Sequence, residues 1–230
     1  MGCGKYRIRF RKAEDLRLVS HHDLLRCFER MLRRAAVPFR CTAGFNPKPR
    51  MVFALSLGLG IVGCEEVVDL ELTEELAAEE VERRLRHEAP AGLDLLSVRR
   101  IDPRATAQVS WVRYRVAVPP ERLASTSTRI QELLDAPACW IERSRPQPRR
   151  LDIRPYLRDV CLSHAYLQMD FWVTPQGTAR PDEVLTLVGL EDLLAGGVIV
   201  ERTLLELHDE SADRGLSAAK PPAVEDSCTP

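Results

Sequence analysis

The chain has 230 residues, enough for one large domain or two of about 100 residues each. Hydrophobic residues make up 45% and charged residues 29%, so a folded protein with a buried core is expected. No stretch approaches the length of an apolar membrane span, and the N-terminus lacks the apolar core of a signal peptide, which together predict a cytoplasmic protein without membrane contact.

The cysteines and the charges limit further which classes of protein the sequence fits. The seven cysteines are scattered and contain no CxxC pair, so no metal site and no cofactor is predicted. The net charge of −1 hides an asymmetry, because residues 1–50 carry 13 Lys and Arg against 4 Asp and Glu, whereas residues 61–90 carry 3 against 10. The basic blocks indicate a polyanion or an acidic partner.

The first half alternates between strand and helix patterns. A helix over 20–36 has an apolar stripe at helical spacing, and an acidic helix over 73–89 has Thr73 as its expected N-cap. The loop over 44–50 contains two prolines, which remove backbone donors. Strands are predicted over 5–12, 39–43, 51–59, 66–73 and 92–102.

The second half repeats this order. Helices are predicted over 120–136 and 180–190, and strands over 111–119, 139–145, 164–174 and 196–207. The repeated order predicts an α+β fold of two tandem ferredoxin-like (split βαβ) units with antiparallel sheets. The expected units are residues 1–103 and 104–208, followed by a disordered tail over 209–230, which is small, polar and proline-containing.

The stretch "SHHD" has two readings, a helix start or a chemical site. Ser20 and Asp23 fit a capping box, which satisfies the free backbone N–H groups of the first turn. Adjacent histidines are poorly placed to share one metal ion, so a metal site is not predicted. His21 remains a catalytic candidate and a candidate contact for an anionic substrate, since it lies at a helix N-terminus.

Four arginines form one face of the first helix, opposite its apolar stripe. They could contact phosphate groups, or they could be a solvated face paired with the acidic second helix. These residues are Arg26, Arg30, Arg33 and Arg34.

The loop "GFNPKPR" is either a rigid turn or a nucleotide contact. Its two prolines stiffen a segment that presents an aromatic ring, an amide and two cations, a combination able to stack on a base and bind phosphate. The candidate RNA-binding residues are Phe45, Asn46, Lys48 and Arg50.

Three further charged residues are considered as a possible acid–base pair or as a buried charge. Glu65 and Glu66 are unconvincing as an acid–base pair, because neighbouring strand residues point to opposite faces. Arg202 lies within an otherwise apolar strand and would need a partner if buried.

These motifs together resemble the bacterial radical SAM-associated (radical SAM-linked) domain family, a family of unknown function. The resemblance spans about residues 4–208. The residues that match its pattern are Ser20, His21 and Asp23; Gly44 to Pro47 and Pro49; Leu55, Leu57 and Gly58; and Glu66. The resemblance implies a cobalamin-binding radical SAM protein as partner. This chain lacks the CxxxCxxC motif, so it looks like the stand-alone partner and not the radical enzyme.

The function expected is an accessory, substrate-binding partner of a radical SAM enzyme that contacts tRNA or rRNA through the basic helix face and the loop. Two alternatives stay open. One is an RNA-directed enzyme with His21 or His22 as the acid or base. The other is a subunit that only binds protein.

Overall fold

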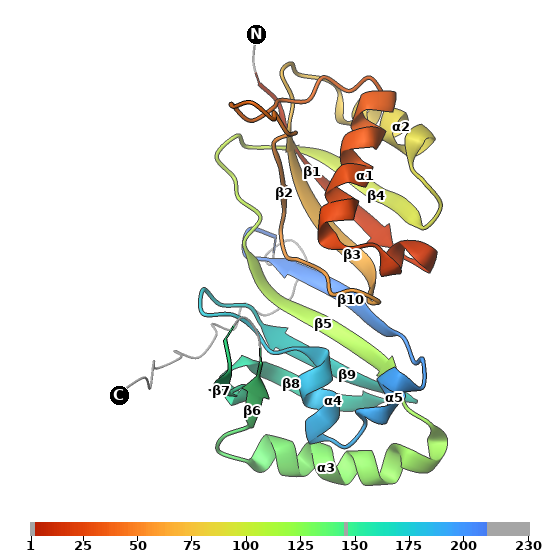
Figure 1. The fold of residues 1–230 in the computed structure, drawn as a ribbon, viewed down its shortest axis with the longest axis vertical. Helices are drawn as coiled ribbons and strands as arrows, with labels where there is room; N and C mark the ends of the chain where they lie inside the picture. Colours follow the sequence, from red (N-terminus) through yellow and green to blue (C-terminus); the bar gives the residue numbers. More distant parts are fainter. Residues whose placement is uncertain (1–2, 145–146, 211–230) are drawn as a thin grey trace. The chain divides into compact units, whose positions relative to one another are not determined.

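The computed structural model describes residues 3–144 and 147–210 (Figure 1). It has a mixed α+β fold with mostly antiparallel strand pairing, as the sequence predicts at that level. The chain divides into two compact units. One holds the residues up to Val109 together with Glu201–Asp209, and the other holds Ser110–Val200.

The first unit is built on one sheet. Its strands run in the order β4-β1-β3, with β2 paired to β3, and β10 runs parallel to the start of β3. Its elements are β1 Lys5–Lys12, α1 His21–Arg34, β2 Met51–Phe53, β3 Val62–Glu71, α2 Ala78–Glu88, β4 Leu93–Ile101 and β10 Val200–Leu207. The sequence predicts units of residues 1–103 and 104–208, and residues Glu201–Asp209 group with the first unit, where Glu201 and Arg202 pair with Val62 and Gly63.

The core of the first unit lies between the sheet and its two helices. Alternate residues of β1 point to this core, because successive strand side chains face opposite sides. They pack against the apolar stripe of α1 and against α2. The main members are Tyr6, Ile8 and Phe10 from β1, Leu24, Phe28, Met31 and Leu32 from α1, and Val81 and Leu85 from α2.

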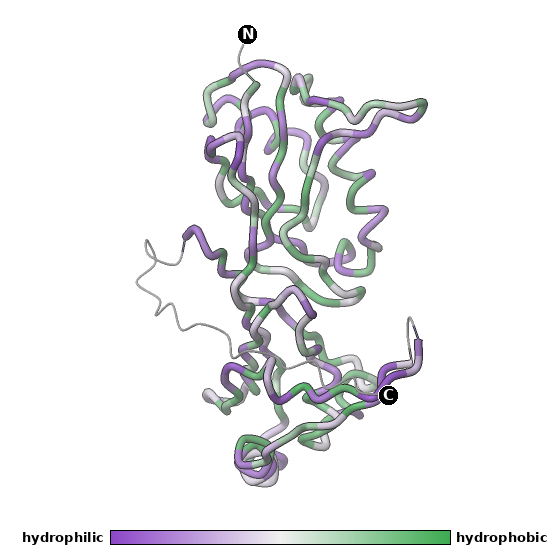
Figure 2. The backbone as a smooth tube through the Cα atoms, turned by 90° about the vertical axis from the view of Figure 1, so that its left-hand side faces the viewer, coloured by the Kyte–Doolittle hydropathy of each residue, from purple (hydrophilic) through white to green (hydrophobic). Residues whose placement is uncertain are grey.

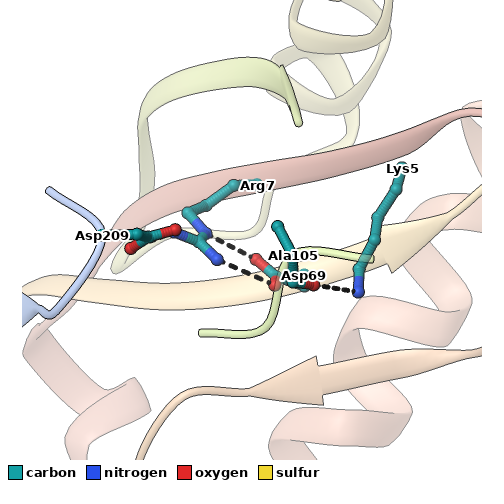
Figure 3. Close-up of polar contacts among 5 residues, drawn as sticks. All are labelled: Lys5, Arg7, Asp69, Ala105 and Asp209. Atoms are coloured by element: carbon teal, nitrogen blue, oxygen red, sulfur yellow. Dashed lines mark hydrogen bonds and ion pairs between the residues drawn. The ribbon is translucent and has the colours of Figure 1, made fainter. Parts of the chain in front are cut away.

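The opposite face of β1 is also buried, although its residues are charged. Arg7 Nε donates to Asp69 Oδ1 over 2.8 Å, and Arg7 Nη1 donates to Asp209 Oδ2 over 2.9 Å (Figure 3). Nearby, Lys5 Nζ donates to the carbonyl oxygen of Ala105 over 2.6 Å. Asp209, the first residue of the predicted tail, is therefore tied to β1. Residues 211–230 of that tail lie outside the described residues.

Three expected elements of the first unit differ from the structure. Thr73 does not cap α2, which begins at Ala78 without a side-chain cap, because Thr73 N–H and Oγ1 both bind the carbonyl oxygen of Pro38. The expected strand over 39–43 is reduced to isolated bridges. The strand expected over 51–59 ends at Phe53, since the carbonyl groups of Leu55 and Ser56 accept hydrogen bonds from a side chain.

The second unit has a three-stranded antiparallel sheet in the order β5-β9-β8 and a separate hairpin of β6 and β7. The sequence predicts β5, β6, β9 and both longer helices, but not β7 or β8. Its elements are β5 Val109–Ala117, α3 Leu123–Asp135, β6 Trp140–Arg143, β7 Arg149–Asp152, β8 Leu157–Ser163, β9 Tyr166–Trp172, α4 Pro181–Leu187 and α5 Asp192–Ala195.

Hydrophobic and hydrophilic residues are interleaved along the chain in both units (Figure 2). Among the described residues, no helix is both long enough and apolar enough to cross a membrane.

Candidate functional site

The start of α1 is fixed by a side-chain cap. Ser20 is the N-cap residue, and its Oγ accepts the backbone N–H of Asp23 over 3.2 Å. The same hydroxyl donates to Asp23 Oδ2 over 2.7 Å, and this hydrogen bond lowers the pKa of Asp23. The cap places His21 as the first helical residue.

Replacing Ser20 with alanine is expected to cost about 1 kcal/mol of unfolding free energy, because the N–H of Asp23 loses its acceptor. Urea denaturation followed by circular dichroism measures this cost. Ser97→Ala, at an exposed position of β4, is the control and should stay within about 0.5 kcal/mol of the wild type. Equal midpoints for the two variants would show that the cap does not stabilise the fold.

The arginine face of α1 is largely paired with acids. Arg33 Nη2 lies 2.8 Å from Glu29 on the same helix, and Arg34 Nε lies 2.9 Å from Glu88 on α2. Arg26 Nη1 lies 3.2 Å from Asp23. Arg30 is exposed. Three of the four arginines thus share their charge with a carboxylate, which weakens the field that this face presents to a phosphate.

The loop over 44–50 is the tip of a hairpin that precedes β2. Its base is closed by two hydrogen bonds, from Thr42 N–H to the carbonyl oxygen of Lys48 over 2.8 Å and from Lys48 N–H to Thr42 Oγ1 over 3.1 Å. Phe45, at the tip, is fully exposed, with a relative accessibility of 108%. Asn46 and Lys48 are exposed as well. The tip therefore presents an aromatic ring, an amide and a cation to solvent.

Two arginines at the base of this hairpin, which spans residues 39–51, share one carboxylate. Arg50 Nη1 lies 3.3 Å and Arg40 Nη1 lies 3.5 Å from Glu71 Oε2. All three side chains are partly exposed. Two cations on one anion leave a net positive charge at the base of the hairpin.

The side chain of His21 lies beside β2, the strand that follows the hairpin. The hairpin joins the sheet at Glu71, which pairs with Lys5 at the start of β1. The ring of His21 packs edge-on against Phe53, with centroids 5.2 Å apart, and lines a cavity with Lys12 at the end of β1. Phe53 lies three residues along the chain from Arg50 at the base of the hairpin, which is about 10 Å.

The cavity beside His21 is small and has mixed walls. Its volume is about 10 Å³, the room of about one water molecule. Its polar lining residues are Lys12, His21 and Glu66, and its apolar lining residues are Phe10, Leu24, Phe53, Leu55 and Leu57. His21, Phe53, Leu55 and Leu57 are half-buried, so the cavity lies close to the surface at this side.

Glu66 is neutralised by a buried arginine. Arg202 Nε donates to Glu66 Oε1 over 2.8 Å, and Arg202 Nη2 contacts Glu66 Oε2, so the pair is bidentate. The other guanidinium N–H groups donate to the carbonyl oxygens of Ser56 and Leu55 over 3.2 and 3.1 Å. Gly63 leaves room for the carboxylate arm, since a Cβ there would lie 2.5 Å from Glu66 Cγ.

Lys12 is the second buried cation of this cluster. Its side chain follows Phe10 onto the core face of β1, and its Nζ donates to the carbonyl oxygen of Val19 over 2.8 Å. Burial lowers the pKa of Lys12, and Arg202 lowers it further, while Glu66 opposes both effects. Burial also lowers the pKa of His21, with smaller contributions from the charges of His22 and Lys12. His21 is therefore mostly neutral at pH 7, able to donate and to accept.

The sequence alone does not indicate Lys12 as a site residue, and it gives Glu66 no role as an acid or base. The relevant signal was present, because Arg202 in an apolar strand requires a buried acceptor. Glu65 and Glu66 do point to opposite faces of β3, with Glu66 buried and Glu65 partly exposed near Arg9.

The segment Arg143–Arg158 of the second unit contains six arginines, and most of those described have structural partners. Arg143 Nε donates to buried Glu183 over 2.6 Å, and Arg158 Nη1 donates to buried Asp170 over 3.2 Å. Arg154 Nη2 donates to the carbonyl oxygen of Leu134. Arg150 stacks over the partly exposed ring of Trp140 at 4.5 Å. Arg145 lies outside the described residues.

Fold and site together define an α+β protein with an aromatic, basic hairpin and a small charged cavity. No group of His, Cys, Asp and Glu within the described ranges could hold a metal ion. The chain belongs to the family described as "Uncharacterized protein conserved in bacteria" (DUF2344), whose model matches residues 5–181. This match includes the hairpin and every residue that lines the cavity.

No curated protein matches the chain. Among solved structures, it is similar to the crystal structure of an unknown protein from Galdieria sulphuraria, at 12% sequence identity and a TM-score of 0.27. That similarity covers 90% of this chain and 99% of the other.

Proposed function

We propose that the protein is an accessory module that contacts single-stranded segments of RNA through the hairpin over 39–51, on behalf of a cobalamin-binding radical SAM protein. The single observation that carries the RNA contact is the fully exposed ring of Phe45 at the hairpin tip. A large apolar side chain at such a position contributes nothing to the core. Its exposure is explained if the ring stacks on a base.

The surroundings of Phe45 support the same reading. Pro47 and Pro49 stiffen the hairpin, so less conformational entropy is lost when the ring is immobilised. Lys48 is exposed beside it, and Arg40 and Arg50 give the base of the hairpin a net positive charge with Glu71. Phosphate contacts from these cations would position the strand while the ring stacks.

The fold supports this proposal at the level of architecture. We propose that each unit derives from a split βαβ ferredoxin-like pattern. In the first unit the order β4-β1-β3, with β2 beside β3, is the order that this pattern requires. Analogy of fold alone is a weak reason for function, so the hairpin carries the argument.

The accessory role is preferred over an RNA-directed enzyme with His21 or His22 as base. A base stacked on Phe45 would lie at the exposed tip of the hairpin, whereas the ring of His21 packs against Phe53 of β2 and lines a small, half-buried cavity. The radical SAM partner rests on the motifs shared with the radical SAM-linked domains, which are Ser20 to Asp23, Gly44 to Pro49 and Leu55 to Gly58.

Phe45→Ala is expected to weaken binding of single-stranded RNA about tenfold, because one base–aromatic stack is worth about 1–3 kcal/mol. Stability should not change, since the ring is exposed. Filter binding with an unstructured RNA oligonucleotide at two salt concentrations measures both affinity and salt dependence. Lys48→Gln should reduce the salt slope by about one.

Leu59→Ala is the matched control, since Leu59 is also a large exposed apolar residue of the first unit. Binding that is insensitive to salt, or equal losses for Phe45→Ala and Leu59→Ala, would rule out the proposed contact.

Co-purification with the radical SAM protein from nuclease-treated lysate tests the partner separately. Retention there, without RNA binding by the isolated chain, would favour a subunit that binds only protein.

A further inference from the structure

The cavity beside His21 has an unbalanced charge. Lys12 and Glu66 line it, and buried Arg202, which binds Glu66, is the second cation of this cluster. Arg202 already engages both oxygens of Glu66, which closes that pair. Lys12 is then left as a buried ammonium group without its own counter-charge among the described residues. A buried charge in this position is costly unless an anion joins it.

The hydrogen bonds of Lys12 also indicate that its ammonium group can bind an anion. An ammonium group has three N–H donors. Within the described part of the chain, Lys12 Nζ has one hydrogen bond, to the carbonyl oxygen of Val19. Its side chain is 1% exposed and lines the cavity. The remaining donors are therefore shielded from bulk water and available to an acceptor in the cavity.

The first turn of α1 also favours negative charge in the cavity. His21 is the first residue of a 14-residue helix, where the helix dipole favours negative charge. Its imidazole lines the cavity at the half-buried side and can donate a hydrogen bond when neutral. The walls on that side are the side chains of Phe53, Leu55 and Leu57.

We propose that this cavity is a binding site for the carboxylate group of a small organic acid or of a peptide C-terminus. One carboxylate oxygen would occupy the volume of about one water and bind Lys12, and the other would face His21. A single negative charge matches the single excess positive charge. The apolar remainder of the ligand would lie along Phe53, Leu55 and Leu57. This site is independent of the RNA contact at the hairpin.

Acetate is the first probe, and acetamide is its neutral counterpart of similar size. We expect acetate to raise the melting temperature of the full chain in a saturable way at constant ionic strength, and acetamide and chloride to have no such effect. In Lys12→Met the affinity for acetate, measured by isothermal titration calorimetry, should fall at least tenfold. Met keeps the length of the side chain and removes the excess charge, so the variant should fold.

Lys48→Met is the matched control, since it removes the same charge at the hairpin and should leave acetate binding unchanged. His21→Gln provides a second variant, at the half-buried side of the cavity, and should also weaken acetate. N-acetylalanine separates the two ligand sources, because tighter binding than acetate assigns the site to a peptide C-terminus and weaker binding assigns it to a small free acid. Equal effects of acetate and chloride, or acetate binding unchanged in Lys12→Met, would overturn the assignment.

Discussion

Replacing Glu66 with alanine is expected to lower the free energy of unfolding of the first unit by about 3–5 kcal/mol. The carboxylate is buried and is held in a bidentate pair by Arg202, while Lys12 lies within its electrostatic reach. Without it, two buried cations would share no counter-charge. Urea denaturation followed by far-ultraviolet circular dichroism measures the loss.

The neighbouring residue supplies the control for this prediction. Glu65 points to the other face of β3, is partly exposed and lies 3.5 Å from Arg9, so Glu65→Ala should cost no more than about 1 kcal/mol. The double variant Glu66→Leu with Arg202→Met should recover much of the stability that Glu66→Ala loses, because it removes the pair together. If Glu66→Ala and Glu65→Ala cost the same, the buried pair does not stabilise the fold.

The sequence predicts well those elements whose apolar pattern and end signals are formed by residues close together in the chain. β1, α1, β3 and β4 have clear apolar patterns, and the cap at Ser20 lies within four residues of its partner. The start of α2 is different. Thr73 looks like a cap in sequence, but its hydroxyl binds Pro38, 35 residues away, and the helix begins later. A contact of that range has no local signature.

The candidate site also depends on contacts between residues that are far apart in sequence. The sequence indicates that Arg202 needs a partner, but Glu66 lies 136 residues away, and only the parallel pairing of β10 with β3 brings the two together. Lys12 is one basic residue among several in β1, and its burial depends on the position of α1. The exposed hairpin is easier to recognise, because its prolines and its aromatic residue are adjacent in sequence.

The high arginine content has a structural explanation in part. Arg7 and Arg202 in the first unit, and Arg143 in the second, are buried with carboxylate partners. Their planar groups satisfy several acceptors at once, which suits a buried pair better than a lysine would. The basic composition of these segments is therefore poor evidence for a polyanion, and only the exposed hairpin favours contact with RNA.

Asp170→Asn is expected to lower the unfolding free energy of the second unit by about 3–5 kcal/mol. Asp170 is 1% exposed and accepts two hydrogen bonds of 2.7 Å from Arg113 and one of 3.2 Å from Arg158. The bonds to Asp170 raise the pKa of Arg113. An asparagine offers one carbonyl oxygen, and its amide N–H groups would face the guanidinium donors.

Tryptophan fluorescence reports this loss directly. All three tryptophans lie in the second unit, and Arg158 stacks on Trp111 at 4.2 Å and on Trp172 at 5.2 Å. Urea denaturation should show a lower midpoint for Asp170→Asn. Asp159→Asn, at the exposed β8 residue opposite Asp170, should stay within about 1 kcal/mol of the wild type. Matching midpoints for the two variants would mean that Arg113 and Arg158 do not depend on Asp170 for their counter-charge.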